Sequence, residues 1–407
     1  MSQQESSGAQ FTFGKASLLP QEEMLEVKKA RKQYIIGIPR EVQKLESRVA
    51  LTPEAVEQLV ELGHTVLIES EAGKSANYMN TDYSELGGTI VEQKRQVFQS
   101  DIILKIAPLT LEEIDLLSEQ QVVISSLHLT NQTEELIRKI MSRKVTAIAF
   151  ENIKDEHNCY PVVRSMSSIA GNTSILIAAE YLSNDRGGKG VMLGGIPGIT
   201  PAEVMILGAG TAAESAVRAA LGLGAHVKVF DSSVHRLRRL QNNIGQRLYT
   251  SIFHKQVLMK TIKSADVVIG AMYLIGTGPR YVITEDMVKE MKKGSVIVDI
   301  SIDQGGCIET SECRTQQEPV YTKHGVIHYC ISNLPSRVSR TASIAISNVF
   351  APLLIRLGET GGIKAFLKED PGVRNGVYLF NGILTNDYIG QHFGIPSKNI
   401  ELLMAAF

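Results

Sequence analysis

The sequence predicts an α/β protein made of two doubly wound, largely parallel sheets in two domains, with a cleft between the domains. The chain has 407 residues, which is more than one hydrophobic core commonly serves. From residue 34 onward, short runs that are apolar at nearly every position alternate with helical patterns. Such runs are typical of strands buried on both faces, and their alternation with helices is typical of parallel sheets.

The composition is that of an ordinary globular protein, with 43% hydrophobic and 21% charged residues. A formal net charge of -1 gives no basic field for nucleic acid or anionic lipid, so neither is an expected partner. Four cysteines without CxxC spacing or a histidine cluster predict no metal site and reduced thiols, as in the cytoplasm. The sequence has no apolar run of about 18 residues and no apolar leader, so we expect no membrane span.

The first domain is expected at residues 34–162, after an N-terminal extension at 1–33 that contains a charged helix over 21–32. Thr52 can cap a helix that begins at Pro53. The expected strands lie within 34–40, 64–70, 88–93, 101–108, 121–128 and 145–151.

The second domain is expected at residues 163–339, beginning with a long helical pattern over 164–185. Its expected strands lie within 202–210, 225–231, 265–272, 294–303 and 324–333. Helices dominate from about residue 340, and helices that follow a nucleotide domain often pack back on the first domain. Residues 340–407 are therefore assigned to the first domain.

The passage 202–231 carries the glycine fingerprint of a dinucleotide-binding site. A strand runs into Gly208 and Gly210, and a helix of small residues follows. Gly208 permits a tight turn, and Gly210 lets the backbone approach a pyrophosphate on the helix N-terminus. We therefore assign the cofactor pyrophosphate to Gly208, Gly210, Thr211 and Ala212. The alternative is a glycine-rich turn that binds no ligand. The flanking strand and helix, which a dinucleotide site requires, argue against this alternative.

The choice of cofactor depends on Asp231, which ends the next strand. A carboxylate there accepts hydrogen bonds from the ribose hydroxyls and repels a 2′-phosphate, so NAD is expected rather than NADP. Arg236, Arg238 and Arg239 follow closely enough to meet a phosphate, which keeps NADP open.

Two later loops follow strands, at the edge where doubly wound sheets bind ligands. The loop at 267–279 should border the nicotinamide, which adds Gly270 and Ala271 to the cofactor candidates. Asp303 follows another strand, just before a double glycine. Its carboxylate either caps its own loop or faces the substrate.

Six motifs occur in an order that is informative as a set: "GIPREVQKLESRVALTP", "LKIAP", "SLHL", "GGIPGITPAEVMILGAGTA", "VDISIDQGGC" and "SNLPSRVSRTASIAISN". Together they resemble alanine dehydrogenase and its relative, the soluble nucleotide-binding part of pyridine nucleotide transhydrogenase. The resemblance covers about residues 34–390. It implies two Rossmann-like domains, an active site in the cleft, and assembly into dimers or hexamers. It also implies oxidation of alanine by NAD to pyruvate and ammonia.

The resemblance also implies roles for single residues. In alanine dehydrogenases an arginine of the "RVALTP"-like motif binds the substrate carboxylate, which points to Arg48. The histidine of the "LHL"-like motif hydrogen-bonds the carbonyl or imine and transfers a proton, which points to His128, and the aspartate of "DQGG" points to Asp303. A guanidinium can bind a carboxylate through two parallel bonds, and a histidine titrates near neutral pH. The motifs around Ser167 and Asn333 add both residues to the cofactor candidates.

One position departs from the family pattern. Alanine dehydrogenases carry two lysines two residues apart in the strand motif, and the second one is catalytic; here Lys105 matches the first and Ala107 replaces the second. Residues i and i+2 of a strand face the same side about 6.6 Å apart, so Lys105 is a catalytic candidate that could reach the missing position. A lysine that only packs or forms an ion pair is the alternative.

Three functions therefore stay open. The preferred one is a cytoplasmic, homo-oligomeric, NAD-dependent dehydrogenase whose substrate is a small amino acid or 2-oxo acid. Hydride exchange between nucleotides, as in a transhydrogenase, predicts a membrane partner in addition to this chain. The third is an NAD(H)-binding protein without turnover, which Ala107 favours.

Overall fold

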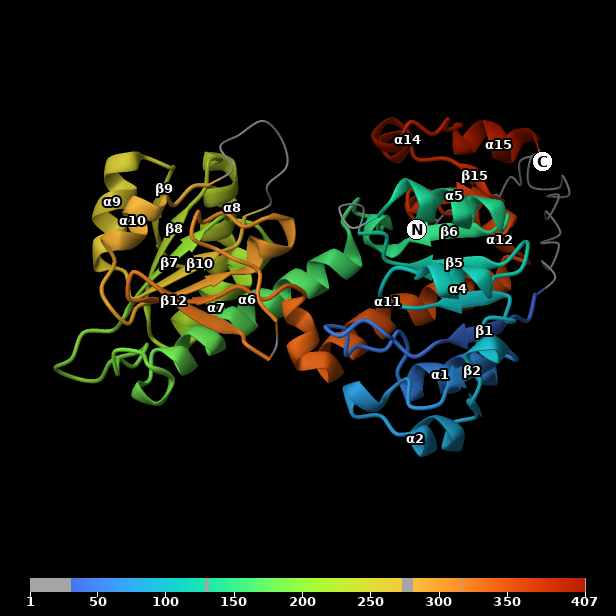
Figure 1. Cartoon of the computed structure of the whole chain (residues 1–407), viewed down its shortest axis with the longest axis horizontal. Coiled ribbons are helices and arrows are strands. Elements are labelled where there is room, and N and C mark those ends of the chain that lie inside the picture. Colours follow the sequence, from blue (N-terminus) through green and yellow to red (C-terminus); the bar gives the residue numbers. More distant parts are fainter. Residues whose placement is uncertain (1–30, 129–131, 273–280, 316, 407) are drawn as a thin grey trace, which may run out of the picture.

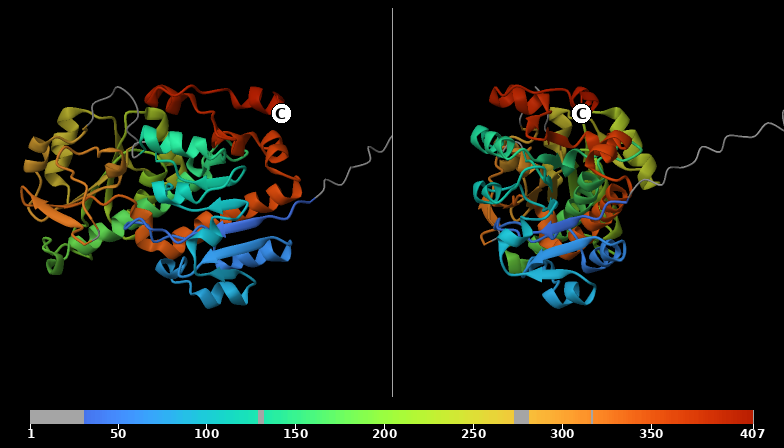
Figure 2. Two further views of the ribbon diagram at one scale, coloured as in Figure 1. Left: turned by 45° about the vertical axis from the view of Figure 1, so that its right-hand side comes forward. Right: turned by 90° about the vertical axis from the view of Figure 1, so that its right-hand side faces the viewer.

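The computed structural model describes residues 31–128, 132–272, 281–315 and 317–406, which form two lobes side by side (Figure 1; Figure 2). The predicted charged helix at 21–32 lies almost wholly outside the described residues. Each lobe contains one sheet covered by helices, so the predicted fold of two doubly wound domains is confirmed.

The first lobe is built on an eight-stranded sheet with the order β15-β14-β6-β5-β4-β1-β2-β3. Its strands are β1 (Ile35–Ile38), β2 (Thr65–Glu69), β3 (Thr89–Val91), β4 (Ile102–Leu104), β5 (Val122–Ser125), β6 (Thr146–Ala149), β14 (Val377–Phe380) and β15 (Ile383–Leu384). The first six are parallel, whereas β14 is antiparallel to both β6 and β15. Every residue of β5 and β6 is buried, as expected for central parallel strands.

The helices of the first lobe are mostly short. They are α1 (Pro53–Glu61), α2 (Asn80–Glu85), α3 (Lys94–Val97), α4 (Leu111–Asp115), α5 (Glu134–Ser142), α12 (Ile363–Glu369), α13 (Pro371–Arg374), α14 (Asp387–Phe393) and α15 (Ile400–Ala406), with the 3₁₀ turns η2 (Lys74–Ala76) and η4 (Phe150–Asn152). Thr52 is the N-cap of α1 as predicted, but its side chain makes no capping hydrogen bond.

The second lobe is built on a seven-stranded sheet with the order β12-β13-β11-β10-β7-β8-β9. Its strands are β7 (Glu203–Leu207), β8 (His226–Phe230), β9 (Tyr249–Ser251), β10 (Val267–Gly270), β11 (Val296–Asp299), β12 (Val320–Lys323) and β13 (Val326–Tyr329). Its helices are α7 (Thr211–Gly222), α8 (Val234–Ile244), α9 (Lys255–Ser264) and α10 (Glu285–Lys289), with the 3₁₀ turns η5 (Asn184–Arg186), η6 (Ile300–Gln304) and η7 (Leu334–Val338).

Two long helices, α6 (Pro161–Tyr181) and α11 (Ser339–Glu359), run from one lobe to the other (Figure 1). Helix α6 packs tightly against α7, because a Cβ at Gly171 would stand 2.1 Å from the carbonyl oxygen of Ala212. Within the described residues, one helical stretch, Leu334–Glu359, is long and apolar enough to cross a membrane, and half of its most apolar window is buried. Buried side chains of its later turns, Ile346, Phe350 and Leu354 among them, belong to the core of the first lobe, whereas Leu334 belongs to the core of the second.

Candidate active site between the domains

Lys105 lies inside the first domain, in a buried group of charges. Its ammonium, which has no exposed side-chain surface, lies 2.7 Å from Glu113 Oε2 and 3.7 Å from Glu41 Oε2. It also donates a hydrogen bond to the carbonyl of Pro108. Lys94 pairs with the other oxygen of Glu113 at 3.2 Å. Burial alone would raise the pKa of Glu113, but its bond to Lys105 and the nearby cations lower it overall.

The strand on which the catalytic role of Lys105 was based stops short of residue 107. Strand β4 ends at Leu104, and the chain bends at Ile106 and Ala107, so the alternation of a strand does not extend to residue 107. Ala107 is 3% exposed, and its N–H faces the carboxylate of Glu41. Burial raises the pKa of Glu41 to about 7, although the Lys105 ammonium lowers it. These contacts favour a Lys105 that forms ion pairs over one that substitutes for the missing lysine.

Arg48 lies at the edge of the first domain and is held by Glu46. Glu46 Oε1 accepts from Arg48 Nε at 2.7 Å, and Oε2 accepts from Nη2 at 2.5 Å. The two side chains are 8% and 4% exposed. Nη1 points to the sulfur of Met166 on α6, which is a weak acceptor. Glu46 thus occupies the Nε side of the guanidinium and leaves the edge formed by Nη1 and Nη2 to other acceptors.

The segment that carries Arg48 is attached to the segment that joins the second domain to α11. Three backbone N–H groups donate to buried serine hydroxyls: Ser47 to Ser336, Val49 to Ser343 and Thr52 to Ser347. The amide of Asn333 donates to the carbonyl of Leu45 and to Glu46. Asn333 was predicted as a cofactor residue, but its side-chain amide binds the first domain.

Asp303 lies in η6, and its Oδ1 accepts the backbone N–H of Asn333 at 3.1 Å. Loss of hydration raises its pKa even though the residue is solvent-accessible, while that N–H, His128 and Arg48 lower it. The structure thus brings together three predicted residues, Arg48 and His128 from the first domain and Asp303 from the second. The capping role considered for Asp303 belongs to Asp299, which caps η6.

Asp299 shapes the loop that presents Asp303. Its buried carboxylate accepts from the backbone of Ser301 and Cys307 and from the hydroxyl of Ser311. Burial raises the pKa of Asp299 in spite of these bonds. Cys307 is wholly buried against this carboxylate, so its thiol does not face the cleft.

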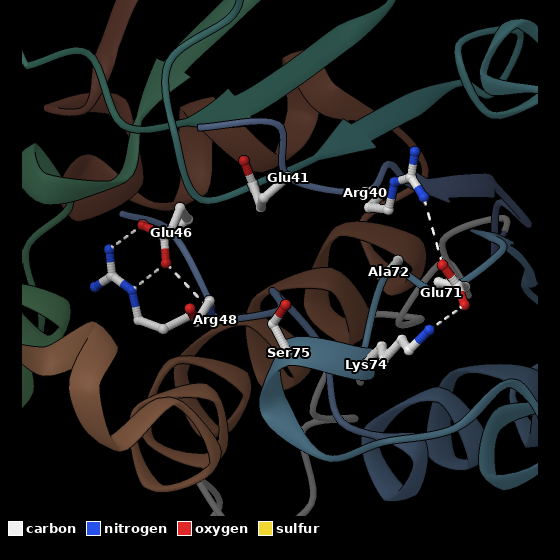
Figure 3. A pocket seen from close by; sticks show the side chains of 9 residues that line it. Arg40, Glu41, Glu46, Arg48, Glu71, Ala72, Lys74 and Ser75 are labelled. Carbon is white, nitrogen blue, oxygen red and sulfur yellow. Dashed lines mark hydrogen bonds and ion pairs between the residues drawn. The ribbon is translucent and has the colours of Figure 1, made fainter. Parts of the chain in front are cut away.

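A polar hollow of about 220 Å³ borders Arg48 (Figure 3). The Glu46–Arg48 pair lies on one side of it, and Arg40, Glu71 and Lys74 form a more exposed group on the other side. The guanidinium of Arg48 is directed away from the middle of the hollow, toward Glu46. The guanidinium of Arg48 therefore does not point into this hollow.

The nucleotide fingerprint has the shape that a pyrophosphate needs. Gly208 has φ +109°, and a Cβ there would stand 2.4 Å from the carbonyl oxygen of Ala271. In front of Gly210, no atom of the described residues lies within 4 Å of where a Cβ would be, and α7 begins at the next residue, Thr211. Free N–H groups and open space thus coincide at the N-terminus of a 12-residue helix, which fits a dinucleotide.

Asp231 is 4% exposed and faces the same loop. Its Oδ2 accepts from Ala209 N at 2.8 Å and its Oδ1 from Ser233 N at 2.7 Å, so each oxygen keeps acceptor capacity for a ribose hydroxyl. Arg236 lies 4.0 Å from this carboxylate, and Arg239 donates to the carbonyl of Ala209. Two of the three arginines considered for a 2′-phosphate therefore have partners here, which favours NAD.

The other cofactor candidates are less closely defined. Ser167 is half-buried on α6, and Ala271 donates its N–H to Leu207 in the fingerprint strand. Gly270 has a packing role, because a Cβ there would stand 2.5 Å from Asp299. Most of the loop predicted to border the nicotinamide, 273–280, lies outside the described residues. Contact of these residues with cofactor stays a prediction.

Known proteins match this chain along most of its length. The profiles of the alanine dehydrogenase/PNT N-terminal and C-terminal domains match residues 37–170 and 174–387. Alanine dehydrogenase of Staphylococcus saprophyticus is 39% identical over 368 residues, which make up 90% of this chain and 99% of that protein. A solved L-alanine dehydrogenase structure has a TM-score of 0.83 at 35% identity and covers 88% of this chain and 99% of its own.

A transhydrogenase structure from Sinorhizobium meliloti shares the fold, with a TM-score of 0.74 at 24% identity over 86% of this chain and 100% of its own. Profiles for both domains and an identity of 39% over 90% of the sequence agree with one another. The chain therefore belongs to the alanine dehydrogenase/pyridine nucleotide transhydrogenase family.

Proposed function

We propose that this protein is an NAD-dependent dehydrogenase of the alanine dehydrogenase type, which converts L-alanine, NAD⁺ and water into pyruvate, ammonia and NADH. One observation carries the proposal. Arg48 and His128 of the first domain lie close enough to Asp303 of the second to act against the burial that raises its pKa. Relatives that are named alanine dehydrogenase and share 38–39% of their residues with this chain support the same reaction.

Arg48 binds the substrate carboxylate in this proposal. Glu46 fixes the plane of the guanidinium from the Nε side, so the Nη1–Nη2 edge is the one that receives the substrate. Two parallel N–H···O bonds form there, and the sulfur of Met166 is displaced as a weak competitor.

His128 and Asp303 act on the other end of the substrate. His128 accepts a proton from the substrate ammonium, so that the nitrogen lone pair can form the imine as hydride leaves the α-carbon, and it serves again as the imine is hydrolysed. Asp303, oriented by the N–H of Asn333, accepts a hydrogen bond from the reacting amino group.

NAD would be held by the pyrophosphate loop at Gly208, Gly210, Thr211 and Ala212 and by Asp231 at the ribose. When bound, it supplies the carbon atom that accepts the hydride. The packing of α6 on α7 through Gly171 ties this loop to the helix that also carries Met166 beside Arg48.

The test follows NADH formation from L-alanine and from a panel of other L-amino acids at alkaline pH, in the wild type and in Ala107→Lys. Ala107→Met is the matched control, because it fills space without adding charge. A preorganised ammonium at a developing charge contributes about a hundredfold or more to kcat, so Ala107→Lys should raise kcat by about that factor and Ala107→Met should not. A wild type that oxidises none of these amino acids would contradict the proposal.

A second candidate is NAD(H) binding without turnover. One observation favours it: the ammonium of Lys105 is committed to Glu113 and Glu41. NADH binding by the wild type, together with activity that appears only in Ala107→Lys, would establish this candidate.

The finer properties stay proposals of the same kind. They are a cytoplasmic location, a homo-oligomer, and domain bounds at 34–162 with 340–407 and at 163–339. Sedimentation of the purified chain tests the homo-oligomer directly.

A further inference from the structure

Glu151 lies beside His128 at the carboxyl edge of the first sheet. His128 follows β5, and Glu151 follows β6, the strand that pairs with β5 in parallel, with Ser125 opposite Ala149. The segments that leave these two strands therefore meet at one edge of the sheet.

One carboxylate oxygen of Glu151 holds the turn that carries His128. Its Oε1 accepts from the backbone N–H of Leu127 at 2.8 Å and of His128 at 3.1 Å. The turn needs support, because His128 has φ +44°, in the left-handed region that residues with a Cβ seldom adopt. The two bonds fix the peptide from which the imidazole projects.

The second carboxylate oxygen indicates that Glu151 is not explained by stability alone, because this oxygen opposes folding. Oε2 is buried and has no hydrogen-bond partner among the described residues. Glu151 also lies near the buried Tyr378, whose pKa is raised first by burial and then by this carboxylate. A buried oxygen without a partner opposes folding, so the benefit of Glu151 lies in the turn that it holds.

We propose that Glu151 is a positioning residue for His128, whose turn it holds so that the imidazole meets the amino or carbonyl group of the substrate. The inference rests on the proposed function. Glu151 acts through His128 and does not touch the substrate. Without the carboxylate the turn relaxes, and a displacement of about 1 Å costs about a hundredfold in rate.

A double-mutant cycle of Glu151→Ala and His128→Ala tests this inference. Pyruvate binding to the enzyme–NADH complex is read by NADH fluorescence without ammonium, so this reading does not depend on turnover; kcat for alanine is read in parallel. Glu151→Gln keeps an oxygen that can accept both N–H bonds. Glu156→Ala removes an exposed glutamate from the following turn and is the matched control. Far-UV circular dichroism and NADH affinity report folding.

Glu151→Ala should weaken pyruvate binding and lower kcat by about ten- to a hundredfold at unchanged NADH affinity, and it should add nothing in the His128→Ala background. Glu151→Gln should stay within a few-fold of the wild type. The inference is overturned if pyruvate binds Glu151→Ala as it binds the wild type, or if the two substitutions act additively. A wild-type complex that binds no pyruvate would overturn the proposed function, and this inference with it.

Discussion

Replacing Lys105 with methionine removes an ammonium from the interior while keeping most of the side-chain volume. The carboxylate of Glu113, 2% exposed, then loses its partner at 2.7 Å, and Glu41 loses its cation at 3.7 Å. Breaking a buried ion pair by removing one partner costs about 3–5 kcal/mol. Glu113 keeps Lys94 at 3.2 Å, so we expect the lower end, about 3 kcal/mol.

Urea unfolding followed by far-UV circular dichroism measures this loss. With a slope of roughly 3 kcal/mol per molar urea, the midpoint of the first domain should fall by about 1 M. NADH affinity should not change, because the nucleotide fingerprint lies in the other domain. The double variant Lys105→Met with Glu113→Gln should be less destabilised than the sum of the single variants, since no carboxylate is left buried without a cation at that position. A Lys105→Met variant that unfolds with the wild type but loses kcat would refute this reasoning and make Lys105 catalytic.

Two further predictions concern the second domain. Burial lowers the pKa of His328 from 6.5 to about 4, so its contribution to stability is complete above pH 6.5 and is lost as the pH falls toward 4. Urea midpoints at pH 7.5 and 5 should therefore differ less in His328→Gln than in the wild type, in which this histidine accounts for a loss of about 2 kcal/mol between these two pH values, and equal differences would contradict the assignment. Gly171→Ala should reduce NADH affinity about tenfold, because its Cβ would displace the carbonyl of Ala212 at the start of α7. Gly222→Ala, at the end of α7, meets no atom of the described residues within 4 Å and should bind NADH like the wild type; similar affinities for both variants would contradict the packing argument.

Much of the fold could be predicted because parallel strands buried on both faces show as continuous apolar runs. The antiparallel hairpins were missed, although the sequence carries their signals. Asn381-Gly382 joins β14 to β15, and His324-Gly325 joins β12 to β13; all four residues have positive φ, as tight hairpin turns require. The short edge strand β9 is not apolar throughout, so it gave no comparable pattern.

Site residues were predictable where a single sequence motif contains both the residue and the structural reason for its role, as at Gly208 and Gly210. It was not predictable where a partner comes from a distant part of the chain. Glu46 stands two residues from Arg48, but the reason for its orientation, Asn333, lies 287 residues away from it. Likewise, the expectation that the Lys105 ammonium could reach the position of the missing lysine assumed that the strand continues to residue 107. Strand β4 ends at Leu104.

The attachment of the Arg48 segment bears on how the two domains can move. Before Arg48, the chain is bonded to Asn333 and Ser336, which leave the second sheet; after it, the chain is bonded to Ser343 and Ser347 on α11. Arg48 therefore lies on a segment that is hydrogen-bonded both to the chain leaving the second sheet and to α11. We expect a rotation of one domain against the other to displace this segment less than the nucleotide loop, so that a substrate carboxylate bound to Arg48 would stay in place as the cofactor approaches it.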